Sequence, residues 1–301
     1  SGLHPDQVVV PGWLPDVAEA RNDILDYYYE VEQFDRQLGE LLQLLKSTGE
    51  YEKTLIVITG DNGMPFPRAK ANAYDAGARI PLIISMPGTT PAMRVDDLVS
   101  LTDLAPTILE LAGQTIPKEM SGESLWPLLT KGSAQTRHAV FIERERHANV
   151  RNPELGYPVR AIRTKDYLYI RNYAPERWPA GDPELYHSVG PFGDVDDSPS
   201  KQFILNNRRD ITVAPFFERG FAKRPAHELY DLRKDPDQLN NVAADPAYKE
   251  VLAVLKKQLN AWQTSTADPR GRKGAVNFDS YPYYGPPVKG APSAYKAPTN
   301  K

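Results

Sequence analysis

The hydrophobic residues of the first hundred positions follow two different periods. Between Pro15 and about Lys46, apolar side chains recur every three or four residues, which predicts a long amphipathic helix. The segments Thr54–Thr59 and Pro81–Ser85 contain continuous apolar runs, which are typical of strands covered on both faces, as in a parallel sheet. This order of helix, strand, loop and strand indicates an α/β sheet. Weaker patterns predict a short strand at Val99 and Leu101 and a helix that ends at Gly113.

The pattern changes beyond about residue 135. Short β-type runs predict a smaller antiparallel sheet, and a final helix has apolar residues on one face; these segments are Val140–Arg144, Val159–Thr164, Leu168–Asn172, Glu228–Leu232 and Ala247–Thr264. We expect residues 1–134 to form the C-terminal part of an α/β domain and residues 135–267 a smaller α+β subdomain. Residues 268–301, rich in Pro, Gly and Tyr, predict an extended or disordered tail.

A long segment between the third and fourth of these strands carries no clear period. Residues 174–225 are rich in Pro, Gly, Asp and aromatic residues and predict an irregular region. Loops of this length in compact domains are usually functional or disordered. This region is therefore a place to look for binding residues.

Composition narrows the classes of function. The chain has 301 residues, of which 41% are hydrophobic and 25% charged, as in ordinary soluble globular proteins. The net charge of −3 gives no overall attraction to nucleic acid, so we expect no nucleic-acid partner. The absence of cysteine excludes disulfides and thiolate metal sites within the chain. No apolar run approaches the roughly 18 residues that a membrane span requires.

Asp61 and Asn62 follow the first predicted strand and are the leading candidates for chemistry. Ligands of α/β sheets bind beyond the carboxyl ends of the strands. A carboxylate beside a carboxamide supplies two hard oxygen ligands of the kind that Ca²⁺ or Mg²⁺ prefers, although two ligands do not close a site. Lys70, eight residues beyond Asn62, could neutralise an oxyanion held by such a metal. The same residues are also common in plain turns, and a lone loop lysine is commonly a solvated charge, so these readings stay open.

A second group of candidates lies at the start of the smaller subdomain. Basic side chains gather there and suit a polyanionic sugar; they are Arg144, Arg146, His147, Arg151 and Arg160. Among them we expect Arg144, His147 and Arg160 to bind substrate, and His147 could also act as an acid. Strand alternation would direct Arg144 and Arg146 to one face, with Glu143 and Glu145 opposite, and the alternative is a solvated, salt-bridged strand.

Several motifs together resemble the sulfatase family of the alkaline-phosphatase-like superfamily. The run TLIVITGDNGMPFPRAKANAYDAGARIPLIISMPG is similar to the second signature region of that family, in which a strand ends in Asp-Asn-Gly and a lysine and an Arg-x-Pro-Leu strand follow. The pattern Tyr27–Asp35 and the ending ELYDLRKDPDQLNNVAADP, followed by a helix with Trp262, are also similar. The stretch Met64-Pro65-Phe66-Pro67 makes the chain most similar to the heparan N-sulfatase (sulfamidase)-like bacterial sulfatases.

The resemblance implies a calcium-dependent hydrolase of carbohydrate sulfate esters or sulfamates, with glycosaminoglycan-like substrates. It implies that Asp61 and Asn62 bind Ca²⁺, with Mg²⁺ less favoured, and that Lys70 is the catalytic cation on the sulfate. The polysaccharide substrates of the family suggest a periplasmic or extracellular location. Gly60 stands where the family commonly has serine.

The family's nucleophile is a formylglycine made from a Cys/Ser-x-Pro-x-Arg motif, and this chain contains no such motif. An upstream Asp-Asp pair and a Lys-x-His segment are also absent. All three belong to the family's N-terminal half. We therefore expect the chain to be a C-terminal portion whose partner is the N-terminal half of the same protein, and which does not turn over substrate alone.

Two alternatives remain open at this point. A phosphoester or phosphonate hydrolase of the same fold would need similar metal ligands, because its substrate is also a tetrahedral oxyanion. A non-catalytic relative that binds sulfated carbohydrate would keep the architecture and lack turnover.

Overall fold

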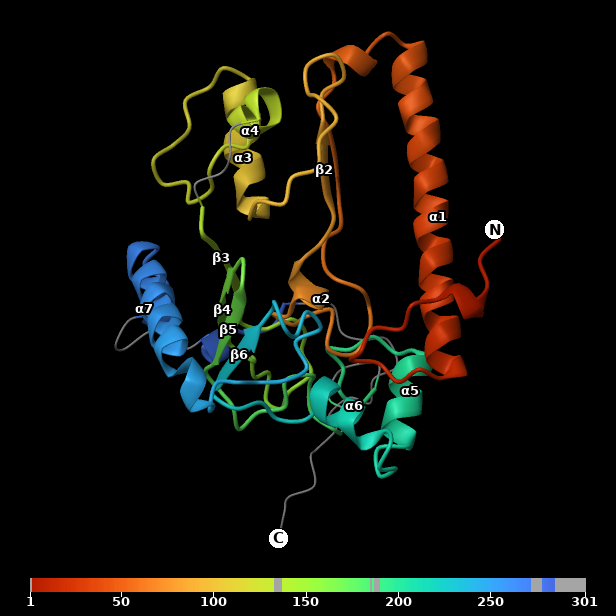
Figure 1. The fold of residues 1–301 in the computed structure, drawn as a ribbon, viewed down its shortest axis with the longest axis vertical. Helices are drawn as coiled ribbons and strands as arrows, with labels where there is room; N and C mark the ends of the chain where they lie inside the picture. Colours follow the sequence, from red (N-terminus) through yellow and green to blue (C-terminus); the bar gives the residue numbers. More distant parts are fainter. Residues whose placement is uncertain (1, 133–136, 185, 187–189, 272–277, 285–301) are drawn as a thin grey trace.

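The computed structural model describes residues 2–132, 137–184, 186, 190–271 and 278–284. A long helix, α1 (Ala18–Ser47), stands beside a two-stranded pair, β1 (Ile56–Thr59) and β2 (Leu82–Ser85), along the long axis of the molecule (Figure 1). The residues of α1 that are buried all lie near its start, and they are Ala20, Ile24 and Leu25. The rest of this helix projects away from the main body of the molecule (Figure 1).

The main hydrophobic core lies at the base of α1. There Ile24 and Leu25 pack with Phe66 and with side chains from α5 (Pro199–Asn206) and the end of α6 (Ala214–Gly220). Burying large apolar side chains of this kind contributes about 1.5–3 kcal/mol each. Because Phe66 and Ala69 belong to this core, the loop that carries Lys70 is fixed from beneath.

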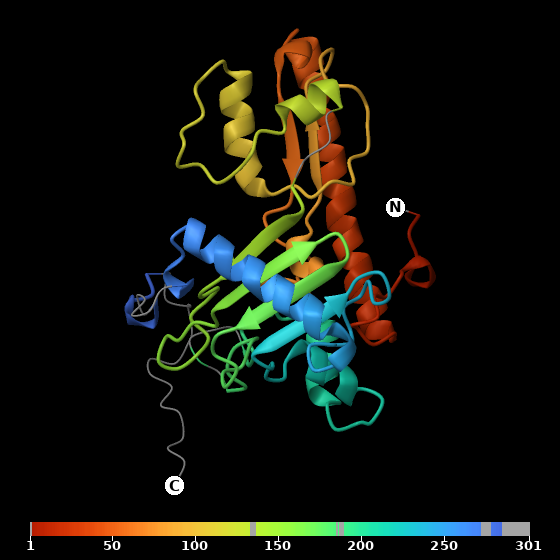
Figure 2. The same cartoon turned by 60° about the vertical axis from the view of Figure 1, so that its left-hand side comes forward.

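A second sheet forms the other half of the body. Strands β3 (Ala139–Arg144), β4 (Val159–Thr164), β5 (Tyr167–Asn172) and β6 (His227–Asp231) are antiparallel and lie in chain order. Helix α7 (Lys249–Ser265) crosses one face of this sheet (Figure 2) and packs Leu255 and Leu259 against it. The opposite face packs against Ala73 and Tyr74, so the sheet supports the segment that follows Lys70.

The shorter helices complete the upper part and the join between the two halves. These are α2 (Asp75–Ala78), α3 (Leu104–Leu111) and α4 (Trp126–Lys131). Side chains at the start of α4 and within it, Leu125, Leu128 and Leu129, pack against Leu82 and Ile84 of β2. Within the described ranges, no helix is long and apolar enough to cross a membrane.

Several predictions made from sequence are confirmed. The mixed α/β character, the antiparallel second sheet and the helix that ends with Trp262 on its apolar face are all present. Strand β4 has the predicted bounds, and β1, β2, β3, β5 and β6 differ from the predicted strands by one or two residues at their ends. The limits of the three parts stay predictions, and the boundary at 134/135 lies outside the described residues.

Other predictions were wrong. We expected β1 to belong to a parallel sheet covered on both faces, but it pairs antiparallel with β2 and is only partly buried. A continuous apolar run does not determine the direction of the neighbouring strand. The expected strand at Val99 and Leu101 is coil followed by a 3₁₀ turn, Leu101–Asp103. The segment 174–225 contains two helices, α5 and α6. The extended or disordered tail stays a prediction, because residues 272–277 and 285–301 lie outside the described part; the described residues of the tail include 3₁₀ turns at Pro269–Gly271 and Phe278–Ser280.

Candidate functional site

The carboxyl end of β1 presents two oxygen ligands to solvent. Asp61 and Asn62 are both exposed and directly follow the strand through Gly60. The side-chain nitrogen Nδ2 of Asn62 donates to the carbonyl of Gly63 at 2.9 Å, which leaves Oδ1 available as an acceptor. No donor within the described part of the chain contacts the Asp61 carboxylate. Two hard oxygen ligands are therefore free at one strand end.

Backbone hydrogen bonds join the start of the following loop to later parts of the same loop. The amide of Gly63 donates to the carbonyl of Gly77, and the amide of Lys70 donates to the carbonyl of Met64, both at 3.0 Å. A Cβ added to Gly63 would lie 2.1 Å from the carbonyl oxygen of Ala76, so glycine is required at this close approach. The loop returns to its own start and holds Lys70 in the same neighbourhood as Asn62.

Arg68 fixes the loop from below. Its buried guanidinium lies 3.8 Å from the centre of the Tyr74 ring, a cation–π contact. It also donates to the backbone carbonyls of Arg219, at 3.1 Å, and of Gln238. Arg68 therefore has an internal role, and Lys70 is the cation of this loop that reaches the surface.

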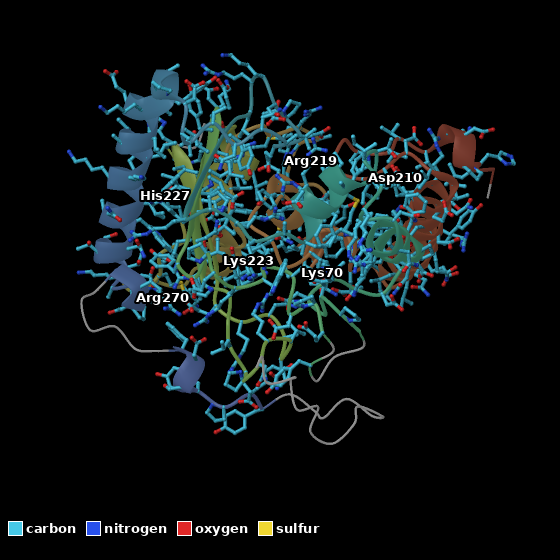
Figure 3. The ribbon with its side chains drawn as sticks, turned by 90° about the horizontal axis from the view of Figure 1, so that it is seen from below. Lys70, Asp210, Arg219, Lys223, His227 and Arg270 are labelled. Atoms are coloured by element: carbon cyan, nitrogen blue, oxygen red, sulfur yellow. The ribbon has the colours of Figure 1, made fainter. Side chains whose placement is uncertain are left out.

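Lys70 forms an ion pair with an aspartate from a distant part of the chain. Its ammonium Nζ lies 2.8 Å from Oδ2 of Asp196, and the two side chains are 24% and 46% exposed. In Figure 3, Lys70 lies between the α7 side, marked by His227 and Arg270, and the α5–α6 side, marked by Asp210. Exposed ion pairs contribute only about 0–1 kcal/mol. An incoming anion can therefore replace Asp196 at little cost.

Arg144 supports the segment immediately after Lys70. Its guanidinium donates to the carbonyl of Ala71 and to those of Tyr157 and Pro179, at 3.2 and 3.0 Å. Burial lowers the pKa of the Arg144 guanidinium to about 10, so it stays charged at neutral pH. In this structure Arg144 ties the Lys70 loop to the second sheet, and as a substrate ligand it stays a prediction.

His147 lies beside a buried acid. Its Nδ1 is 3.2 Å from Oδ1 of Asp194, and the imidazole is 34% exposed. The other oxygen of Asp194 accepts a hydrogen bond from Nη2 of the buried Arg151 at 2.5 Å. Burial opposes the charged form of Asp194, but the charge of Arg151 and the hydrogen bond from His147 outweigh it, so the pKa of Asp194 lies far below its ordinary value.

Arg160 lies on the opposite face of the second sheet. Its neighbours Val159 and Ala161 face Tyr74, so strand alternation directs Arg160 towards α7. It forms a two-pronged pair with the buried Asp268, at 2.8 and 2.9 Å, and a third contact with Glu145 at 2.8 Å. Burial works to lower the pKa of Arg160, but the hydrogen bond to Asp268 and the charge of Glu145 raise it overall. The structure thus separates Arg160 from the Lys70 loop, and its role as a substrate ligand stays a prediction.

The end of β1 offers two candidate ligands for a metal ion. The oxygen donors of Asp61 and Asn62 fit the preference of Ca²⁺ or Mg²⁺ for hard ligands. Within the described ranges, however, no group of three His, Cys, Asp or Glu side chains gathers where it could hold a metal. Calcium takes six to eight ligands, so the two present here would form one side of a larger site.

Sequence reasoning missed the two aspartates of this neighbourhood. Asp194 and Asp196 lie 47 and 126 residues from the partners His147 and Lys70, and no spacing rule connects them. The only signal was their place in the long 174–225 segment, since long loops are commonly functional. Arg151 was noted as one of several cations, but its pairing with Asp194 was not foreseen.

Two family models match the chain in overlapping stretches. The model described as sulfatase matches residues 9–114. The model described as N-sulphoglucosamine sulphohydrolase, C-terminal, matches residues 68–186. The matched stretches include Asp61, Asn62 and Lys70 in the first and Lys70, Arg144 and His147 in the second.

Individual relatives agree with these matches. The chain is 30% identical to an ulvan-active sulfatase of Formosa agariphila over 86% of the chain and 41% of that protein. It is 30% identical to human N-sulphoglucosamine sulphohydrolase over 88% of the chain and 52% of that protein. The solved structure of BT4656 with D-glucosamine-2-N,6-O-disulfate has the same fold, with a TM-score of 0.52 and 22% identity over 79% of this chain and 40% of that one.

The chain spans about half the length of the curated relatives that it matches. Its two sheets and their loops correspond to part of the larger sulfatase fold. On the combined evidence of the two models and these relatives, the chain belongs to the sulfatase family and carries the C-terminal region of the N-sulphoglucosamine sulphohydrolase type.

Proposed function

We propose that this chain supplies the metal-binding and anion-binding side of the active site of a carbohydrate sulfatase. The observation that carries the proposal is the arrangement at the end of β1, where Asp61 and Asn62 are exposed and the closed loop behind them presents Lys70. Family membership and the glucosamine sulfates named for the relatives favour a sulfated amino sugar as substrate.

Each residue has a defined part in this proposal. Asp61 and Asn62 hold a calcium ion, which when bound stabilises negative charge on the sulfate oxygens. Lys70 leaves Asp196 and donates to a sulfate oxygen, where negative charge accumulates as the bond to the sugar breaks. Arg68 and Arg144 keep the loop in place, so that little reorganisation accompanies the reaction. The nucleophile, which we propose to be a formylglycine, comes from the N-terminal half of the intact protein.

The test compares three substrates in the intact protein that contains this chain. We expect release of sulfate from a sulfated glucosamine saccharide and no comparable turnover of phosphonate or phosphate monoesters. Binding of the saccharide without any release would favour the non-catalytic relative instead. Preferred turnover of a phosphonate monoester would overturn the sulfatase assignment.

Lys70→Ala provides the residue-level test, with Lys223→Ala as the matched control. Lys223 is an exposed lysine near the centre of the molecule (Figure 3), but its ammonium lies over the Trp178 ring and it does not follow Asp61 and Asn62 in a strand-end loop. We expect Lys70→Ala to lower kcat by about 100-fold or more, as for other groups that stabilise charge in a transition state. Equal rates for the two variants would contradict the role of Lys70.

A further inference from the structure

The chain contains a histidine whose orientation is fixed by buried charges. Asp194 is ionised because Arg151 lies against it, and an ionised carboxylate can only accept hydrogen bonds. The nitrogen Nδ1 of His147, 3.2 Å from Asp194, must therefore carry the hydrogen. In the neutral ring this leaves Nε2 as an acceptor, and no group in the described part of the chain bonds to it.

The acid itself is fixed in place by several contacts. The backbone amide of Asp194 donates to the carbonyl of Ala180 at 2.9 Å. The buried ammonium of Lys201 donates to two backbone carbonyls that flank Asp194 in sequence, those of Val195 at 2.8 Å and Phe192 at 3.3 Å. Arg151 donates in addition to the carbonyls of Trp178 and Pro179, at 2.6 and 2.7 Å. This amount of support is typical of a functional side chain whose geometry matters.

The free-energy cost of burying Arg151 also favours a role for this residue beyond packing. Nη1 of Arg151 is buried and has no hydrogen-bond acceptor among the residues that the structure describes. A buried donor of this kind costs about 1–3 kcal/mol. An apolar side chain would fill the same space without that cost, but it would leave Asp194 without its charge partner.

His147 and Lys70 belong to one neighbourhood. Lys70 pairs with Asp196 and His147 with Asp194, and the two aspartates are two residues apart, so their Cα atoms are separated by about 7 Å at most. The carbonyl of Pro179 accepts from both Arg144 and Arg151 and so links the support of the Lys70 loop to that of His147. Because the two pairs share this short stretch of chain, a sulfate on Lys70 would bring its sugar towards His147.

We propose that His147, held by Asp194 and Arg151, recognises the sugar that carries the sulfate, with Nε2 accepting a hydrogen bond from a hydroxyl or amine N–H of that sugar. This inference rests on the proposed function and adds a specificity residue to it. His147 contacts the substrate, and Asp194 and Arg151 are positioning residues.

The test uses the intact protein and two sulfate esters, a sulfated glucosamine saccharide and an aryl sulfate that has no sugar ring. We expect His147→Gln to raise KM for the saccharide about tenfold, equivalent to about 1.4 kcal/mol, with kcat changed far less and both constants for the aryl sulfate unchanged. Asp194→Asn should likewise raise KM for the saccharide and leave the aryl sulfate unchanged. An asparagine amide can donate a hydrogen bond to Nδ1, so the hydrogen of the imidazole would no longer be held on Nδ1. The ¹⁵N chemical shifts of the His147 ring should report this change.

His227→Gln is the control, since His227 also has a bonded Nδ1, 2.9 Å from the Tyr169 hydroxyl, but lies on the α7 side of the sheet (Figure 3). It should leave both substrates unaffected. An equal loss on saccharide and aryl sulfate, or no change on the saccharide, would overturn the inference.

If the proposed function is wrong, the wild-type protein will release sulfate from neither ester, and this outcome differs from every outcome that concerns His147 alone. In that case the affinity for the saccharide, measured by calorimetry, decides. Weaker binding by His147→Gln than by His227→Gln supports the inference, and equal binding overturns it.

Discussion

Cationic side chains that are close in sequence have different structural roles in this chain. Arg68 and Lys70 lie in one loop, yet Arg68 is buried against Tyr74 while Lys70 reaches a surface aspartate. Arg144 and Arg160 were both expected to bind substrate, and they lie on opposite faces of one sheet. Strand alternation could have separated them, but which face meets the Lys70 loop depends on the tertiary fold.

The ion pairs of Arg160 predict a large effect on stability. Arg160→Ala leaves the buried Asp268 without its charge partner, while Glu145 keeps its pair with Arg270, and breaking a buried pair costs about 3–5 kcal/mol. Urea unfolding should show this loss. The control is Arg94→Ala, whose pair with Asp96 is exposed and should change stability by no more than about 0.5 kcal/mol. A small effect of Arg160→Ala would mean that Arg160 is held more loosely than the structure shows.

Asp194 predicts how stability responds to acid. Its pKa is lower in the folded chain than its ordinary value near 3.9, so its contribution is fully present above about pH 4. The contribution is lost as the pH falls through the lowered value, because the unfolded chain then binds more protons. Urea unfolding between pH 7 and pH 3 should show a steeper decline for the wild type than for Asp194→Asn. Parallel curves would contradict the assignment.

At the scale of the elements, local patterns were read well and long-range pairing was not. Strand β4 has the bounds that its short β-type run predicts. The direction of β1 relative to β2 depends on chain topology, which an apolar run does not encode. Helix α5 was missed although Ser198 accepts from the amide of Lys201 and Pro199 opens the helix, a recognised start signal.

Helix α1 predicts a surface that the rest of a sulfatase would cover. Large apolar side chains of its outer part are exposed, including Phe34 at 51%, Leu41 at 54% and Leu44 at 57%. Replacing these three with serine should leave the melting temperature of the chain nearly unchanged and reduce its self-association, as measured by sedimentation. Ile24→Ala, at the buried base, should instead cost about 2–5 kcal/mol. Equal destabilisation by both sets would contradict the exposed position of the outer helix.

At the scale of the whole molecule, the proposed function gives this chain one side of an active site. Asp61 and Asn62 could be found from sequence because they are adjacent and follow a strand, whereas His147–Asp194 and Lys70–Asp196 are brought together only by folding. The exposed Asp61 and Asn62, the exposed outer part of α1 and the match to about half of each relative agree with one another. Together they support an active site that is completed by further residues of the intact protein.

The most direct measurement is sulfate release by the intact protein after removal and return of calcium. We expect the chelated wild type to lose activity and to recover it with Ca²⁺, if Asp61 and Asn62 bind the ion as proposed. Asp61→Ala and Asn62→Ala should stay at least about 100-fold less active at the calcium concentration that restores the wild type. Full recovery of either variant at that concentration would contradict the account.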